Sequence, residues 1–205
     1  MDNLIKYIRK KYHPHVLIIY GSFADGSNNE NSDFDALLIA DVAVESHDSS
    51  FVDGTELDLF IYPDEKFKGE VDWSNFLQLY DGRIIVDTDG SASRIVSAVR
   101  NYIDNKPQKT QSEKRFSVEW CEKMLMRIQR SDAEGFFRLH WVLVDSLEIY
   151  FDLIGIAYPG PKKGLRKISE IDKTGYGLYE RALCSSSYDH LQRWIEYLRK
   201  MFENH

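Results

Sequence analysis

The stretch YGSFADGSNNENSDFDALLI, residues 20–39, decides how the first half of this chain folds. It opens on a Gly-Ser pair, continues through small and polar residues, and closes on an apolar run that is typical of a β-strand. Asp33 and Asp35 stand on either side of Phe34, just where the apolar run begins. Because residues two apart on a strand point to the same side, both carboxylates are expected on one face.

Helix and strand signals alternate around this stretch. Short apolar runs that end at Gly, Pro or polar residues predict strands, and Leu4, Ile5 and Ile8 on one face predict an amphipathic opening helix. Ser91 is expected to cap the helix that closes this half of the chain. The predicted strands are 15–20, 34–40, 56–62 and 82–88, and the predicted helices are 1–15, 72–80 and 91–105.

A third aspartate lies on another predicted strand. Asp58 sits in the middle of ELDLFIY (56–62), between Leu57 and Leu59. If the two strands are neighbours, three carboxylates converge, and two unit charges about 4 Å apart repel by about 4 kcal/mol at an effective dielectric of about 20. Cations must neutralise such a cluster, and oxygen-only ligands suit Mg²⁺ together with substrate phosphates.

The Gly-Ser end of the stretch has the features of a phosphate site. Gly21 follows a predicted strand, and a glycine allows the backbone to approach a phosphate closely. Ser22 is expected to begin a turn into a short helix, whose first N–H groups favour an anion. Phosphate donors at one end and metal ligands at the other predict a site for a metal-bound nucleoside triphosphate.

The stretch GSFADGSNNENSDFD resembles the signature of the DNA polymerase beta-like nucleotidyltransferase superfamily, and the specific resemblance covers about residues 16–62. It is most similar to small stand-alone bacterial members, such as the aminoglycoside and lincosamide nucleotidyltransferases and the minimal nucleotidyltransferases of toxin–antitoxin pairs. The resemblance implies an α+β fold, in which a mixed sheet with its active site at one edge is followed by an α-helical bundle.

The resemblance also implies roles for individual residues. Gly21 and Ser22 match the phosphate-holding pair of the family, and Asp33 and Asp35 match its two metal ligands. Ser32, which opens the Ser-Asp-x-Asp motif, is a further candidate for nucleotide binding. Asp58 fits the third carboxylate of the family, although Glu56 and Asp53 are close by. Alternation favours Asp58, since Asp53 and Gly54 are typical of a turn. The residues assigned to the site in this half are Gly21, Ser22, Ser32, Asp33, Asp35 and Asp58.

The implied reaction is the transfer of a nucleoside monophosphate. An acceptor hydroxyl attacks the α-phosphate of a nucleoside triphosphate, and pyrophosphate leaves. Two Mg²⁺ ions assist by activating the attacking oxygen and neutralising the developing charge. ATP is the common donor among relatives and is the donor expected here.

The second half of the chain has almost no strand signal. The polar segment 105–112 is the expected linker, so the predicted domains are 1–106 and 107–205. Helical periods run through 113–130, 132–157 and 188–202, which predicts a helical bundle. The break YPGPKKG (158–164) separates two of these helices.

Two features of the helical half are candidates for a role at the site. Asp145, Glu148 and Asp152 share one face of a helix, either as a solvated stripe or as an acidic wall that attracts a cationic acceptor. Glu148 is the candidate general base of that wall. In the proline-glycine loop, Lys162 is a candidate contact for triphosphate oxygens; otherwise its charge only solubilises a turn.

Composition limits the classes of partner. The net charge is −7, which disfavours tight binding to a nucleic-acid backbone. With two distant cysteines and no apolar run long enough to span a membrane, we expect a cytoplasmic protein without membrane contact, either a monomer or a homodimer. The favoured hypothesis is that the acceptor is a small molecule, with antibiotics among the candidates. The alternatives are a protein or tRNA acceptor of the toxin–antitoxin type, and a nucleotide-binding module that has lost catalysis.

Overall fold

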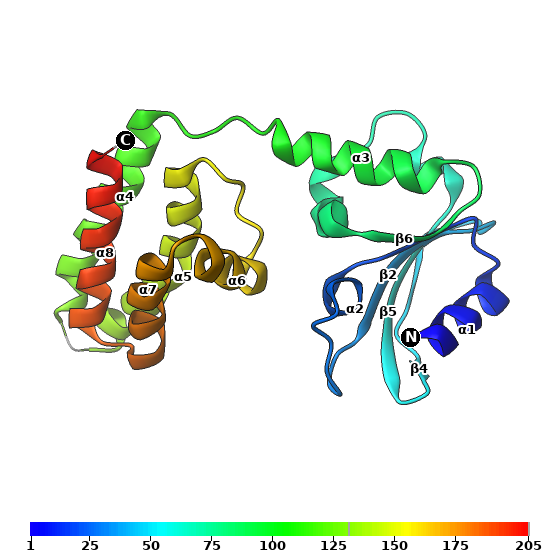
Figure 1. The fold of residues 1–205 in the computed structure, drawn as a ribbon, viewed down its shortest axis with the longest axis horizontal. Coiled ribbons are helices and arrows are strands. Elements are labelled where there is room, and N and C mark those ends of the chain that lie inside the picture. Colours follow the sequence, from blue (N-terminus) through cyan, green and yellow to red (C-terminus); the bar gives the residue numbers. More distant parts are fainter. Residues whose placement is uncertain (131, 205) are drawn as a thin grey trace. The chain divides into compact units, whose positions relative to one another are not determined.

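The structure of the chain is a computed structural model that describes residues 1–130 and 132–204. The Cα positions divide into two compact units, the first spanning Met1–Asn105 and the second beginning at Lys106 (Figure 1). Each unit has its own hydrophobic core and is described by itself below.

The first unit is built around a mixed sheet. Its strands are β1 (Val16–Ile19), β2 (Phe34–Ile39), β3 (Ser46–Asp48), β4 (Phe51–Val52), β5 (Thr55–Tyr62) and β6 (Arg83–Asp87). The main path of the sheet is β3-β5-β2-β1-β6, and β4 pairs with β5. Only β2 and β5 run parallel; the other pairs in the described part of the chain are antiparallel. The predicted mixed sheet is therefore confirmed.

Helices cover both faces of this sheet. The helical elements of the unit are α1 (Asp2–Tyr12), α2 (Gly21–Asp25), the 3₁₀ segments η1 (Asp64–Phe67) and η2 (Trp73–Asp81), and α3 (Ser91–Asp104). On one face α1 buries Leu4 and Ile8 against alternate residues of β1, β2 and β5. On the other face η2 and α3 pack against the remaining apolar residues of β1 and β2. Since β1 is covered on both faces, all four of its residues are apolar and buried.

Two local expectations for this unit are wrong in detail, and two short strands were not predicted. The predicted helix 72–80 is a 3₁₀ segment with non-helical backbone at Phe76. The short strands β3 and β4 carry too few residues to show a period and were not predicted. The residue before the first turn of α3 is Gly90 rather than Ser91, and the carboxylate of Asp87 accepts hydrogen bonds from the N–H groups of Ala92 and Ser93. The carboxylate of Asp87 thus caps the N-terminus of α3, the role that was expected of Ser91.

The edge strand β3 is tied to α1 by one carboxylate. Asp48 accepts hydrogen bonds from Lys11 Nζ at 2.8 Å and from the Tyr12 hydroxyl at 2.5 Å, and its other oxygen accepts from Ser50 N at 2.9 Å. Burial alone would raise the pKa of Asp48. The hydrogen bonds from Lys11, Tyr12 and Ser50 outweigh burial and hold the pKa well below its usual range.

Asp48→Asn is therefore expected to lower the free energy of unfolding by about 2 kcal/mol at pH 7, because hydrogen bonds to a charged group contribute about 1.5–3 kcal/mol and Lys11 is partly exposed. A depressed folded-state pKa adds stability that is present above about pH 4 and is lost as the pH falls further. Urea unfolding of both proteins at pH 7 and at about pH 3 measures this. An equal difference at the two pH values would contradict it.

The second unit is helical, as predicted. Its helices are α4 (Gln111–Ile128), α5 (Ala133–Ile154), α6 (Pro161–Ile171), α7 (Lys173–Ser185) and α8 (Tyr188–Glu203). Trp194 of α8 is fully buried in the core, where its indole N–H donates to Ser146 Oγ at 2.9 Å. Thr110 and Glu113 form a capping box that starts α4 at the end of the polar segment. Among the described residues, none of the helices has the length and apolar character to cross a bilayer.

The expected break at 158–164 is shorter than predicted. Pro161 occupies the first turn of α6, so the Pro-Lys-Lys-Gly part of the segment is helical. A proline fits this position because its missing N–H is one that the first helical turn leaves unpaired in any case.

Candidate functional site

The site begins at the end of β1, where the chain turns sharply into α2. Gly21 has φ +64, a left-handed conformation that side chains disfavour. A Cβ built on Gly21 would lie 2.2 Å from Asp35 Oδ2, well inside van der Waals contact. The carboxylate of Asp35 therefore lies directly against the Gly21 backbone, and only glycine fits there. Ser22 follows as a buried residue of α2.

Strand pairing brings the three aspartates together. In the parallel register of β2 and β5, Asp35 is the direct partner of Asp58. Asp33 lies two residues before Asp35, so it projects from the same side of the sheet. One carboxylate oxygen from each of the three residues lies within 4.8 Å of the others. Asp33 is exposed, and Asp35 and Asp58 are half-buried.

These dimensions fit a divalent cation with oxygen ligands. Mg²⁺ binds oxygen at about 2.1 Å, so two oxygens on one ion lie at most about 4.2 Å apart. Side-chain movements of less than about 1 Å would bring the observed oxygens within that limit. A cluster of carboxylates without nitrogen or sulfur donors is also the ligand set that hard cations prefer. Asp33, Asp35 and Asp58 are thus the described residues that could hold Mg²⁺.

The third carboxylate of the cluster belongs to Asp58 and not to Glu56 or Asp53, the two nearby alternatives. Glu56 lies on the same side of β5 and lines the pocket beside the cluster, but it is not one of the three residues whose oxygens converge. Asp53 has φ +51 in the turn between β4 and β5, and its carboxylate accepts a hydrogen bond from Asn3 Nδ2 at 3.1 Å.

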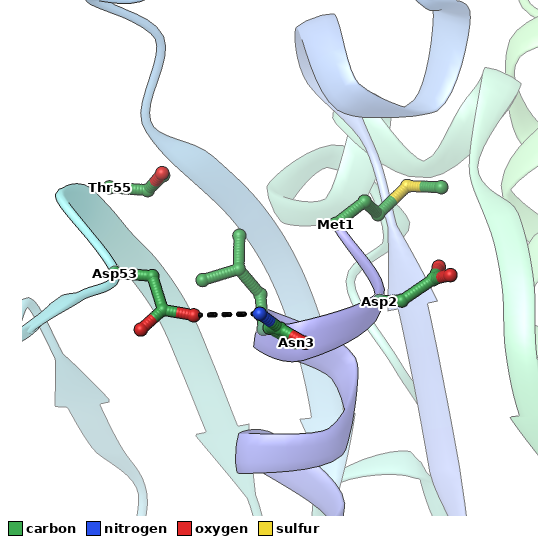
Figure 2. Close-up of a pocket in the computed structure, with 6 residues that line it drawn as sticks. Met1, Asp2, Asn3, Asp53 and Thr55 are labelled. Atoms are coloured by element: carbon green, nitrogen blue, oxygen red, sulfur yellow. Dashed lines mark hydrogen bonds between the residues drawn. The ribbon is translucent and has the colours of Figure 1, made fainter.

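Asp53 also lines a separate, larger pocket of about 510 Å³ at the start of α1, which Figure 2 shows. The other lining residues are Met1, Asp2, Asn3, Leu4 and Thr55. The dashed line in Figure 2 is the hydrogen bond from Asn3 to Asp53. None of the three clustered aspartates lines this pocket, so its larger volume does not make it part of the carboxylate site.

Two residues of the site carried no recognisable signal in the sequence. Tyr20 is buried beside the cluster, and burial first, then the charges of Asp58 and Asp35, raise the pKa of its phenol so that it stays neutral. His47 on β3 directs Nε2 to Asp58 Oδ1 at 2.5 Å. Tyr20 lies between the end of β1 and the start of α2, and His47 belongs to a three-residue strand, so neither position is part of a periodic pattern.

A pocket of about 290 Å³ opens beside the carboxylates. It is lined by Asp33, His47, Ser49, Glu56, Leu57 and Asp58. Three of these residues are acidic, so the pocket attracts cations and repels anions.

The remaining predicted site residues lie elsewhere. Ser32 closes the turn before β2, where its hydroxyl accepts a hydrogen bond from Asn29 N at 2.9 Å. Glu148 is an exposed residue of α5, and Lys162 is an exposed residue in the first turn of α6. Asp152 of the acidic stripe forms an ion pair with Lys109 at 2.6 Å. The roles of Ser32, Glu148 and Lys162 stay predictions.

A turn that places a glycine backbone against a strand carboxylate, with two more carboxylates converging beside it, is an arrangement that could hold a divalent cation together with phosphate oxygens. Residues 1–115 match the model of the nucleotidyltransferase domain family, which is more than half of the chain. The chain therefore belongs to this family, and the resemblance seen in the sequence is confirmed.

Solved structures that are similar to this chain include the crystal structure of a nucleotidyltransferase-like protein from Exiguobacterium sibiricum 255-15. The two share 13% sequence identity with a TM-score of 0.45, and the alignment covers 98% of this chain and 72% of that chain. A comparison with curated proteins gives no match.

Proposed function

We propose that this chain transfers a nucleoside monophosphate from a Mg²⁺-bound nucleoside triphosphate to a hydroxyl group and releases pyrophosphate. The observation that carries the proposal is the convergence of Asp33, Asp35 and Asp58 beside Gly21. Membership of the nucleotidyltransferase family supports the same reaction. In the transfer, the acceptor oxygen forms a bond to the α-phosphorus, the bond from that phosphorus to the pyrophosphate oxygen breaks, and the proton of the acceptor hydroxyl is released to water.

Each part of the site has a role in this proposal. Asp33, Asp35 and Asp58 hold the metal, with two ions expected when the triphosphate is bound. The bound metal supplies charge neutralisation for the phosphates and lowers the pKa of the attacking hydroxyl. The bare backbone at Gly21 and the adjoining Ser22 let the triphosphate lie close to the chain. The protein thus contributes mainly positioning and electrostatics.

The pocket beside the carboxylates favours a small, uncharged or cationic acceptor. It measures about 290 Å³, and its lining includes Glu56 together with Asp33 and Asp58. A polyanionic tRNA end would be repelled by these charges and by the net charge of −7. A hydroxylated small molecule with amino groups, antibiotics included, is therefore the proposed acceptor, and ATP is the proposed donor. Nucleotidyl transfer to a protein side chain is the second candidate.

The test is an assay of pyrophosphate release with Mg²⁺ and each of the four nucleoside triphosphates. The acceptor panel contains aminoglycosides, lincosamides, tRNA and the protein itself, and the products are identified by mass. We expect one acceptor to gain a nucleoside monophosphate, and the double variant Asp33→Asn, Asp35→Asn to form no adduct. The absence of any adduct together with an absence of Mg²⁺-dependent triphosphate binding would leave only a binding module without catalysis.

A further inference from the structure

We propose that His47 is a positioning residue, which holds the carboxylate of Asp58 in the orientation that binds the metal. This inference rests on the proposed function, since it concerns the same carboxylate cluster. Nothing in the sequence motif includes His47, which lies on β3 at the edge of the sheet, eleven residues before Asp58.

The contact between the two side chains is direct. His47 Nε2 lies 2.5 Å from Asp58 Oδ1. An ionised carboxylate can only accept hydrogen bonds, so the ring nitrogen is the donor. A carboxylate has about four lone-pair sites, so this bond leaves Asp58 free to share its remaining lone pairs with a cation.

The imidazole ring packs against one neighbouring ring, and the residue that follows it in the strand is anchored. In the antiparallel pairing of β3 with β5, His47 is the direct partner of Phe60, and the two ring centroids lie 4.8 Å apart. The next residue, Asp48, is anchored to α1 through Lys11 and Tyr12. A half-exposed ring would otherwise sample several rotamers, and these contacts restrict it to the one that reaches Asp58.

The carboxylate of Asp58 can rotate, so a hydrogen-bond partner affects its orientation. The terminal torsion of an aspartate is broad, so a half-buried carboxylate rotates unless a partner fixes it. Asp35 already lies against the Gly21 backbone, whereas the contact that orients Asp58 comes from an edge strand. Hydrogen-bond partners of metal ligands typically contribute a factor of about 10–100 in metal affinity or activity.

A purely structural role would give a different result. His47 could simply fasten β3 to β5, in which case its loss would lower stability but leave the metal affinity of the folded protein unchanged. The same unit provides a matched control, because His15 Nε2 lies 2.8 Å from Asp64 Oδ1 in a His–Asp pair that does not touch the carboxylate cluster.

The experiment compares wild type with His47→Ala, His47→Gln and His15→Ala. Electron paramagnetic resonance measures Mn²⁺ affinity in the presence of a non-hydrolysable ATP analogue, and thermal unfolding of each variant confirms that it is folded. We expect His47→Ala to weaken Mn²⁺ binding about 10–100-fold. His47→Gln should recover most of the affinity, because its amide nitrogen can take the place of Nε2, and His15→Ala should bind Mn²⁺ as wild type does.

Two results overturn the inference alone: wild-type Mn²⁺ affinity in His47→Ala, or a loss in His47→Gln as large as that in His47→Ala. If wild type itself binds no Mn²⁺ with the analogue, the proposed function fails and this inference fails with it. Should His47→Ala not fold, the comparison of His47→Gln with His47→Asn decides. Both keep an amide donor, but only glutamine reaches as far as Nε2, so equal affinities would contradict the proposal.

Discussion

Asp35→Asn is expected to reduce nucleotidyl transfer at least about a thousandfold without loss of stability. The metal supplies several kcal/mol of transition-state stabilisation, and each 1.36 kcal/mol corresponds to about a factor of ten in rate. Asparagine has the shape of aspartate and therefore still fits against Gly21. It lacks the charge that attracts the metal, so the loss should appear in the dependence on Mg²⁺ as well as in the rate.

Asp35→Asn is expected to keep or increase the stability of the protein, although it lowers activity. With oxygens no more than 4.8 Å apart, each pair of charges in the cluster repels by at least about 3 kcal/mol at an effective dielectric of about 20, before the solvent exposure of Asp33 reduces the repulsion. Removing one charge should therefore leave the melting temperature unchanged or raise it in the absence of metal. Unfolding of Asp35→Asn at low salt, with and without Mg²⁺, measures this.

Asp53→Asn is the matched control for this variant. It removes a carboxylate from the same region, but Asp53 lies in the turn before β5 and outside the cluster. Asparagine tolerates the left-handed backbone at this position and keeps an oxygen for Asn3. Rates in Asp53→Asn should stay within a factor of about three of wild type. A large loss in Asp53→Asn with activity retained in Asp35→Asn would mean that the wrong carboxylates have been assigned.

Gly21→Ala is expected to destabilise the first unit by about 2–5 kcal/mol and to lower activity at least about a hundredfold. The backbone strain of a left-handed alanine costs about 1–2 kcal/mol, and forcing a methyl group into occupied space adds about 1–3 kcal/mol. The atom that must move is Asp35 Oδ2, only 2.2 Å from the new methyl group. The substitution therefore displaces a proposed metal ligand, so activity should fall even in protein that remains folded.

Gly26→Ala separates the effect of backbone strain from the effect of the clash with Asp35. Gly26 has φ +76, close to that of Gly21, but a Cβ there meets no atom within 4 Å. Backbone strain should lower the free energy of unfolding of this variant by about 1–2 kcal/mol, and its activity should be unchanged. Chemical unfolding and the rate of transfer, measured for both variants, give the comparison. Equal losses of stability and activity in the two variants would rule out a specific role for the contact between Gly21 and Asp35.

The carboxylate cluster was accessible from the sequence because it depends on the two-residue period of strands. Alternation placed Asp58 opposite the apolar residues Leu57 and Leu59, and the parallel register then sets it beside Asp35. Central strands such as β1 were equally clear, because burial on both faces requires an uninterrupted apolar run. The local pattern sets the face on which each of these residues lies, whereas the convergence of Asp58 with Asp33 and Asp35 also required β2 and β5 to be neighbours, which the sequence left as a condition.

His47 and the cap of α3 were missed because both depend on contacts between separate segments. Strand β3 has three residues and shows no period, so only its pairing with β5 reveals that His47 reaches Asp58. At the start of α3 the N–H groups of Ala92 and Ser93 donate to Asp87 on β6, so the expected serine cap does not form. In α6, a proline that was read as part of a loop is instead the first helical residue.

The most direct test of the central claim is calorimetric titration of the protein with a non-hydrolysable nucleoside triphosphate, with and without Mg²⁺. If Asp33, Asp35 and Asp58 hold the metal that binds the triphosphate, wild type should bind the triphosphate only when Mg²⁺ is present. Asp35→Asn should bind it weakly whether or not Mg²⁺ is present. Equal binding by wild type and Asp35→Asn, or no binding by wild type in Mg²⁺, would contradict the assignment of these three carboxylates.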